Sequence, residues 1–173
     1  WMSGRGAHYV EKLVNQDLVV IHTVSSQSYV APLGGIESIL GTNPLTIGLP
    51  TANGPLIFDM GTSAIMYTDL TLRERRGEQL PEGVAIDAQG NPTQDPTAAR
   101  EGALLPFAGH KGFGLALMMH AMGLLTGAGT TADKNNGHLI IAFKPDLMYS
   151  TEQYKEDVSA LLTRIKTSKR AQG

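Results

Sequence analysis

The stretch from Leu105 to Gly127, LPFAGHKGFGLALMMHAMGLLTG, limits what this chain can fold into more than any other part of the sequence. Its part after Lys111 belongs to an uncharged run that extends to Asp133. Its apolar residues recur at helical spacing on two neighbouring faces. One face carries Leu115, Met118, Met122 and Leu125, and the other carries Leu117, Ala121 and Leu124. The pattern predicts a helix that is buried on most sides. Its roughly dozen continuous helical residues fall short of the ~20 that cross a bilayer, so we expect a core helix.

The turn in front of this helix carries a His-Lys pair, His110 and Lys111, between glycines. The first turn of a helix presents unpaired backbone N–H groups and a partial positive charge, so with this pair it suits a phosphate or a carboxylate. The alternative is that Gly109, Gly112 and Gly114 only permit close packing, with Lys111 in solvent. The turn matches neither the G-x-x-x-x-G-K-[ST] phosphate loop nor the G-x-G-x-x-G fingerprint, and by itself it leaves both interpretations open.

Composition excludes several classes of function. The 173 residues are enough for one domain with a sizeable core, and 42% hydrophobic against 17% charged residues is typical of a soluble globular chain. A formal net charge of -2 gives no electrostatic reason to expect nucleic acid or an anionic membrane as a partner. Without cysteine there are no disulfides, thiolate nucleophiles or cysteine zinc sites. No leader or membrane-spanning pattern is visible, so we expect a cytoplasmic protein.

The rest of the chain alternates predicted helices and strands. In chain order they are a helix over 7–18, strands over 18–24, 45–49, 56–58 and 138–143, and a helix over 151–166. Thr151 is the predicted cap of the last helix, with Glu152 adding a favourable charge in its first turn. The segment 80–96 is rich in Pro and Gly but keeps apolar residues, which favours an extended hairpin or lid. This order predicts an α/β fold without a clean βαβ nucleotide-binding unit.

Asp59 is the most suggestive single residue, because it follows the predicted strand PLIF directly. Junctions at the carboxyl ends of strands are where α/β proteins place ligands. A carboxylate there could orient or polarise a catalytic partner, or it could cap the helix that follows; the two roles can coexist. Thr62 and Ser63 extend the junction with hydroxyl groups suited to a phosphate or a ribose.

The histidines give little support to a metal site. The five of them show neither an H-E-x-x-H motif nor closely spaced carboxylate partners. His120 lies inside the apolar helix and is interpreted as a core histidine with satisfied hydrogen bonds. The segment Asp133 to Gly137 is similar to a calcium loop but lacks the downstream bidentate Glu, so we interpret it as an ordinary loop. The chain has no G-x-S-x-G elbow, which argues against a serine hydrolase.

Four segments, in order and wording, resemble the type-2 malate/L-lactate dehydrogenase family, whose members include ureidoglycolate dehydrogenase, diketogulonate reductase and Δ1-piperideine-2-carboxylate reductases. The segments are GTNPLTIGLP, PLIFDMGTSA, LPEGVAIDAQGNPTQDP and GALLPFAGHKGFGLALMMHAMGLLTG. The resemblance runs from about residue 1 to residue 166. It implies an α/β fold distinct from the Rossmann fold, with a mixed sheet flanked by helices, and a homodimer.

The resemblance also implies an activity and a site. The activity is an NAD(P)-dependent oxidoreductase that transfers a hydride between NAD or NADP and a small 2-hydroxy/2-oxo acid or cyclic imino acid. The implied cofactor-binding residues are Ser26, Asp59, Met60, Gly61, Thr62, Ser63, His110 and Lys111. Asp59 is also the implied catalytic residue, because the family Asp supports a catalytic histidine. Thr42 of the GTNP turn is implied to lie near the substrate.

The chain also departs from the family pattern. Family members are longer, and their proton-donating histidine lies in an N-terminal region with no counterpart here. The resemblance therefore implies that residues 1–173 form the NAD(P)-binding core domain, without that region and without the C-terminal end, and that this chain alone is inactive. Two alternatives remain open, a non-catalytic nucleotide-binding or assembly module derived from the family, and a general α/β structural domain.

Overall fold

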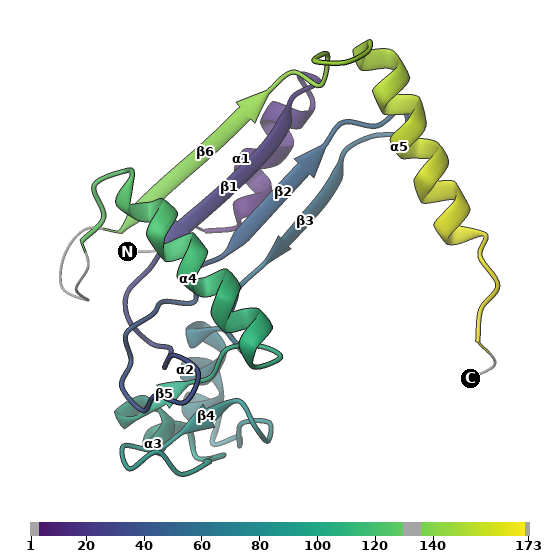
Figure 1. The fold of residues 1–173 in the computed structure, drawn as a ribbon. Coiled ribbons are helices and arrows are strands. Elements are labelled where there is room, and N and C mark those ends of the chain that lie inside the picture. Colours follow the sequence, from purple (N-terminus) through teal and green to yellow (C-terminus); the bar gives the residue numbers. More distant parts are fainter. Residues whose placement is uncertain (1–3, 130–135, 172–173) are drawn as a thin grey trace. The chain divides into compact units, whose positions relative to one another are not determined.

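A computed structural model describes residues 4–129 and 136–171 (Figure 1). The chain divides into two compact units. The first unit comprises Trp1–His22, Thr46–Asp59 and Ile140–Gly173, and the second comprises Thr23–Leu45 and Met60–Leu139. The division runs through the strands of the larger sheet, so each strand of that sheet contributes residues to both units.

The larger sheet has the strand order β3-β2-β1-β6, and neighbouring strands run antiparallel (Figure 1). Its strands are β1 (Val19–Ser25), β2 (Leu45–Leu49), β3 (Leu56–Met60) and β6 (Gly137–Phe143). Four predicted strands are thus found at their predicted places. β1 is a nearly continuous run of apolar and β-branched residues, which is typical of a strand that is covered on both faces, and it is buried along almost its whole length.

Within the first unit, helix α1 (Gly6–Val14) packs on the sheet through a small apolar cluster. Val10 and Val14 of the helix meet Val20 of β1 there. Gly48 of β2 lets the helix approach closely, because a Cβ at this position would lie 2.3 Å from a methyl carbon of Val10. The predicted helix over 7–18 is confirmed, and it ends at residue 14, where the chain turns into β1.

Helix α5 (Thr151–Lys166) has the predicted bounds, but its predicted cap is wrong. The cap is Ser150, whose hydroxyl oxygen accepts a hydrogen bond from the backbone N–H of Gln153, with Glu152 in the first turn as expected. Along α5, all of which the structure describes, no residue is buried. The Lys155 ammonium group pairs with the Asp17 carboxylate at 2.7 Å.

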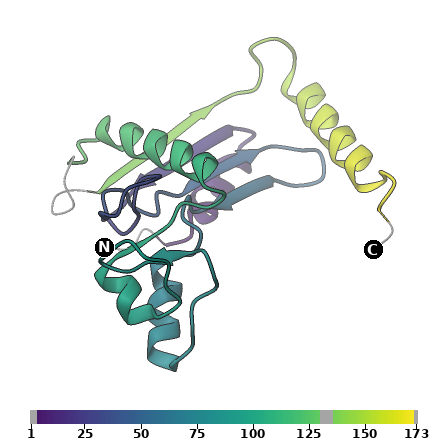
Figure 2. The same cartoon turned by 60° about the horizontal axis from the view of Figure 1, so that its bottom comes forward.

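The second unit contains the remaining elements, α2 (Tyr67–Arg76), β4 (Ala85–Ile86), α3 (Pro96–Glu101), β5 (Ala103–Leu104) and α4 (His110–Leu124). Helices α2 and α3 lie side by side (Figure 2), and α3 also contacts both strands of the antiparallel pair β4–β5. Segment 80–96 forms the hairpin expected of it, since Ile86 and Pro92 bridge in antiparallel fashion. Val30 adds a bridge to Leu104 in the parallel sense.

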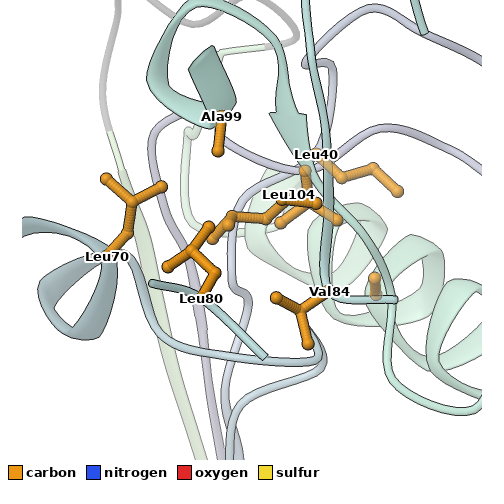
Figure 3. Close-up of a cluster of buried hydrophobic side chains, with 9 residues drawn as sticks. Leu40, Leu70, Leu80, Val84, Ala99 and Leu104 are labelled. Atoms are coloured by element: carbon orange, nitrogen blue, oxygen red, sulfur yellow. The ribbon is translucent and has the colours of Figure 1, made fainter. Parts of the chain in front are cut away.

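The core of the second unit gathers apolar side chains from nearly all of its elements (Figure 3). Leu70 comes from α2, Ala99 from α3 and Leu104 from β5, and each is at most 3% exposed. Leu80 and Val84, from the segment predicted as a hairpin or lid, join this cluster. That segment is therefore part of the core. The α/β class with flanking helices is confirmed.

Helix α4 departs from the sequence prediction in its burial. Its buried residues are Gly112, Ala116, Met119 and Gly123. Several large apolar residues on its other faces are exposed, among them Leu117 at 49% and Met118 at 56%. The buried residues are spaced four, three and four apart on one face, and all but Met119 are small, which lets the helix approach its neighbours. A Cβ at Gly112 would lie 2.3 Å from the Phe107 carbonyl oxygen. The prediction of burial on most sides is wrong. Within residues 4–129 and 136–171, no helix combines the length and the apolar character needed to cross a membrane.

Candidate functional site

Asn43 is the centre of a hydrogen-bond network in the second unit. Its side chain is fully buried, and its Oδ1 accepts from the backbone N–H of Ser26 at 3.0 Å. Its Nδ2 donates to the carbonyl oxygen of Ala116, inside α4, at 3.0 Å. The same Nδ2 lies 3.5 Å from Nδ1 of the half-buried His120. One amide side chain thus links the end of β1, the 41–44 turn and the middle of α4.

The local backbone explains why an asparagine occupies this position. Asn43 has φ 26°, a conformation that Asn adopts more readily than most residues. The preceding Gly41 leaves room for the network, because a Cβ there would lie 2.3 Å from the Ser26 hydroxyl oxygen. Ser26 and Thr42, predicted to contact cofactor and substrate, have their hydroxyl oxygens 3.4 Å apart. No role for Asn43 is predicted from the sequence, although a polar residue between Gly41 and Pro44 is a signal for one.

The predicted junction after β3 is tied to the same network. Thr62 is fully buried, and its hydroxyl group donates to the carbonyl oxygens of Thr42 and Asn43, each at 3.1 Å. The Ser63 hydroxyl group donates to the carbonyl oxygen of Ile65 at 2.7 Å. Both hydroxyl protons are therefore engaged within the protein, which leaves the oxygens as acceptors. Ahead of them, Gly61 keeps the chain close to Met66, since a Cβ would lie 2.6 Å from the Met66 sulfur.

A short bridge connects this junction to the turn before α4. The Phe107 backbone N–H donates to the Thr62 carbonyl oxygen at 3.2 Å, and the Ala64 N–H donates to the Leu105 carbonyl oxygen at 2.8 Å. The predicted cofactor residues 62–63 therefore lie beside the strand-like segment that leads into His110. Four segments named from the sequence, around Ser26, Thr42, Thr62 and the start of α4, meet in one unit.

The turn itself has unusual backbone geometry and open donors. Ala108 and Gly109 both have positive φ, 45° and 59°. His110 and Lys111 have exposed side chains. Among the described residues, the backbone N–H groups of Gly109 and His110 have no hydrogen-bond acceptor. Gly112 is needed for close packing against Phe107, so one glycine of the turn fits the packing interpretation, while the helix start keeps the donors that an anion requires.

Asp59, the residue given the catalytic role, belongs to the first unit and is described there by itself. Its Oδ2 accepts from the backbone N–H of Ala7 at 2.8 Å, and its Oδ1 accepts from the Thr46 hydroxyl group at 2.9 Å. The Asp59 carboxylate therefore caps α1, which precedes it in the chain by 52 residues. The interpretation of Asp59 as a cap of the following helix is wrong, because that helix, α2, has Met66 at its N-cap position. The residue is exposed, so its carboxylate remains accessible.

A polar crevice of about 260 Å³ in the second unit escaped the sequence analysis. Tyr29 and Tyr67 stack there with ring centroids 3.7 Å apart, and Arg100 donates to the Tyr67 hydroxyl oxygen at 2.7 Å while pairing with Glu74. Burial raises the pKa of Tyr29, and the neighbouring Tyr67 adds to the rise. Hydrogen bonding to Arg100 lowers the pKa of Glu74. The guanidinium charge is thus compensated within the protein.

Metal ligands are not grouped in the described part of the chain, where no cluster of three or more His, Asp or Glu could hold an ion. The loop that is similar to a calcium site, Asp133 to Gly137, lies mostly outside the described residues.

Comparisons with known proteins agree with this arrangement. Residues 2–173 match the family described as Malate/L-lactate dehydrogenase. The chain is 37% identical to the L-sulfolactate dehydrogenase of Methanocaldococcus jannaschii, over 98% of this chain and 52% of the relative. It is 41% identical to the Delta(1)-pyrroline-2-carboxylate/Delta(1)-piperideine-2-carboxylate reductase of Pseudomonas aeruginosa, over 80% of this chain and 46% of the relative.

A solved dehydrogenase structure from Sinorhizobium meliloti superposes with a TM-score of 0.92 at 31% identity, over 99% of this chain and 53% of that chain. The chain therefore spans about half the length of the relatives that it matches. Because the family match extends over nearly the whole sequence and agrees with the fold, the chain belongs to the malate/L-lactate dehydrogenase family.

Proposed function

We propose that this protein is an NAD(P)-dependent oxidoreductase that transfers a hydride between a nicotinamide cofactor and a small 2-hydroxy/2-oxo acid or cyclic imino acid. The observation that carries the proposal is the network around Asn43, in which Ser26, Thr42 and Thr62 are joined. Relatives named as a sulfolactate dehydrogenase and as imino acid reductases support the substrate class. These substrates share a carboxylate beside the carbon that gains or loses the hydride.

The start of α4 is the proposed contact for the cofactor phosphates. Lys111 contributes a positive charge, and the N–H groups of Gly109 and His110 contribute donors at the positive end of the helix dipole. Met60, Gly61, Thr62 and Ser63 are proposed to line the same cofactor, and Thr62, which is fully buried, is proposed to do so by holding the 42–43 turn in place. The nicotinamide supplies the hydride when it is bound, and the protein has to hold the ring and the substrate.

Asp59 is the proposed catalytic residue. The reaction needs a proton donor beside the substrate, and a carboxylate can orient a histidine and stabilise its charged form. Two donors on the protein side fix the Asp59 carboxylate, while its exposure leaves lone pairs open for such a histidine. Thr42 is the proposed substrate contact, because its side chain lies beside Ser26 in the network.

A location and an oligomeric state are proposed as well. We place it in the cytoplasm as a homodimer, with residues 1–173 forming the cofactor-binding core. The exposed apolar residues of α4, among them Leu117 and Met118, provide a surface suited to burial in an assembly. Sedimentation analysis gives the oligomeric state directly.

Cofactor binding tests the proposed function. Isothermal titration of the protein with NADH and with NADPH is expected to show binding to at least one of them. Lys111→Ala should weaken it by about 1–3 kcal/mol, the scale of a charge-assisted hydrogen bond. Lys144→Ala is the matched control, since Lys144 is also exposed and follows β6.

The outcomes separate the alternatives. When the histidine-bearing region implied by the family resemblance is supplied, binding with turnover supports the oxidoreductase, whereas binding without turnover supports the non-catalytic nucleotide-binding module. Failure of both cofactors to bind, or equal affinity for the Lys111→Ala and unmodified proteins, contradicts the proposed site.

A further inference from the structure

The first unit contains a continuous polar chain that the sequence analysis did not anticipate. His22 on β1, Thr46 on β2 and Asp59 on β3 are three residues from three neighbouring strands. Nδ1 of His22 lies 3.3 Å from the Thr46 hydroxyl oxygen, which lies 2.9 Å from Oδ1 of Asp59. His22 and Thr46 are fully buried, and Asp59 is exposed. This chain of hydrogen bonds therefore leads from the protein interior to an accessible carboxylate.

The number of protons available to each group fixes which group donates and which accepts along these hydrogen bonds. A carboxylate can only accept hydrogen bonds, and a threonine hydroxyl group has a single proton to donate. Because Thr46 donates that proton to Asp59, its oxygen can only accept from His22. Nδ1 of His22 must then carry a proton. The order of donation is His22 to Thr46 to Asp59.

The start of α1 completes the arrangement. The Ala7 backbone N–H donates to Oδ2 of Asp59 at 2.8 Å, so each carboxylate oxygen has its own donor from the protein. Gly6 makes the close approach of the helix possible. A Cβ at Gly6 would lie 2.2 Å from the Thr46 hydroxyl oxygen and 3.0 Å from Nδ1 of His22, so even an alanine would displace the hydroxyl group. The space at Gly6 is thus the space that Thr46 needs.

From this geometry we propose that Thr46 is a positioning residue for Asp59, and that it holds His22 as the Nδ1–H tautomer. With both oxygens anchored, the carboxylate plane is set by α1 on one side and by Thr46 on the other. Removal of the hydroxyl group leaves Oδ1 without its donor, and the carboxylate can rotate about the remaining bond to Ala7. The catalytic consequence of this rotation rests on the proposed function of Asp59, whereas the tautomer of His22 does not.

The experiment compares Thr46→Val, which keeps the shape and loses the hydroxyl group, with Thr46→Ser, which keeps the hydroxyl group. The first measurement is ¹⁵N NMR of the His22 ring at neutral pH, with His22→Gln to assign the signals. In the unmodified protein and in Thr46→Ser, Nδ1 is expected to carry the proton. In Thr46→Val the Nδ1 resonance is expected to shift, because its acceptor is gone. A proton on Nε2 with a bare Nδ1 in the unmodified protein overturns the proposed chain.

The second measurement is steady-state kinetics with NAD(P)H and a 2-oxo or imino acid, on the protein supplied with the histidine-bearing region that the family resemblance implies. Thr46→Val is expected to lower kcat by about tenfold or more, the scale of a misplaced catalytic group, with KM changed less than about twofold. Thr46→Ser is expected to recover most of the rate. Unchanged kcat in Thr46→Val overturns the positioning role. If the unmodified protein has no turnover while the His22 ring proton is on Nδ1, the proposed function is contradicted. The hydrogen bonds from His22 through Thr46 to Asp59 are then still supported.

Discussion

Replacement of Asn43 by alanine should destabilise the protein more than any other single change to the polar residues of the candidate site. The side chain is fully buried and bridges two segments through bonds of 3.0 Å each, to the Ser26 N–H and to the Ala116 carbonyl oxygen. Asn43→Ala removes both bonds and leaves a void where the amide was. The change is therefore expected to loosen the 26–43 loop from α4.

The expected magnitude follows from what each partner loses. The N–H of the half-buried Ser26 is left without its acceptor, which costs about 1–3 kcal/mol. The Ala116 carbonyl oxygen lies inside a helix that supplies its own donor, so its loss costs about 1 kcal/mol. A positive φ of 26° suits alanine less than asparagine and adds about 0.5–1 kcal/mol. Together these terms lower the free energy of unfolding by about 2.5–5 kcal/mol.

Urea denaturation followed by circular dichroism measures this difference. Asn53→Ala is the matched control, because Asn53 is exposed in the turn between β2 and β3 and should change stability by less than about 0.5 kcal/mol. Asn43→Asp separates volume from hydrogen bonding, since it keeps the shape and the acceptor for Ser26 but sets an oxygen against the Ala116 carbonyl. It is expected to be destabilising as well.

Hydrogen exchange gives a local check on the same reasoning. Protection of the Ser26 N–H should be lost in Asn43→Ala and retained in Asn53→Ala. The reasoning is refuted if Asn43→Ala lies within about 0.5 kcal/mol of the unmodified protein, or if the Ser26 N–H keeps its protection without the Asn43 side chain.

Two further predictions concern packing and charge. Gly112→Ala should destabilise the protein, because its Cβ would lie 2.3 Å from a backbone oxygen. Gly114→Ala, whose Cβ would have nothing within 4 Å, should stabilise the protein by about 0.5–1 kcal/mol. Thermal unfolding compares the two variants, and equal shifts of the unfolding temperature would contradict the packed face assigned to α4. A hydrogen bond from Arg100 lowers the pKa of Glu74, so the ionised Glu74 stabilises the folded protein. The unmodified protein should therefore be more stable than Glu74→Gln at neutral pH, and this difference should vanish as the pH falls below the ordinary glutamate range. Unfolding curves over that pH range, repeated in high salt to screen the pair, measure it, and a difference that grows toward low pH would contradict the assigned pairing.

Much of the fold was predictable because its signals are local. Helix α5 has the predicted bounds, since an amphipathic repeat and a polar cap act within a few residues of each other. The strands β1, β2, β3 and β6 follow from short apolar and β-branched runs. The family resemblance rests on local motifs as well, and nearly the whole chain matches the family.

What the sequence by itself did not determine depends on residues that are distant in the chain. The burial of α4 was mispredicted because large apolar residues suggest a core, while the neighbours that pack against the helix select its small residues instead. Asp59 caps α1, 52 residues away, because β-strand pairing brings the end of β3 to the start of that helix. Thr46 and His22 gain their roles from the same pairing. Propensities act over a turn or two of chain, so the partners of a buried polar group are decided only when the tertiary structure forms.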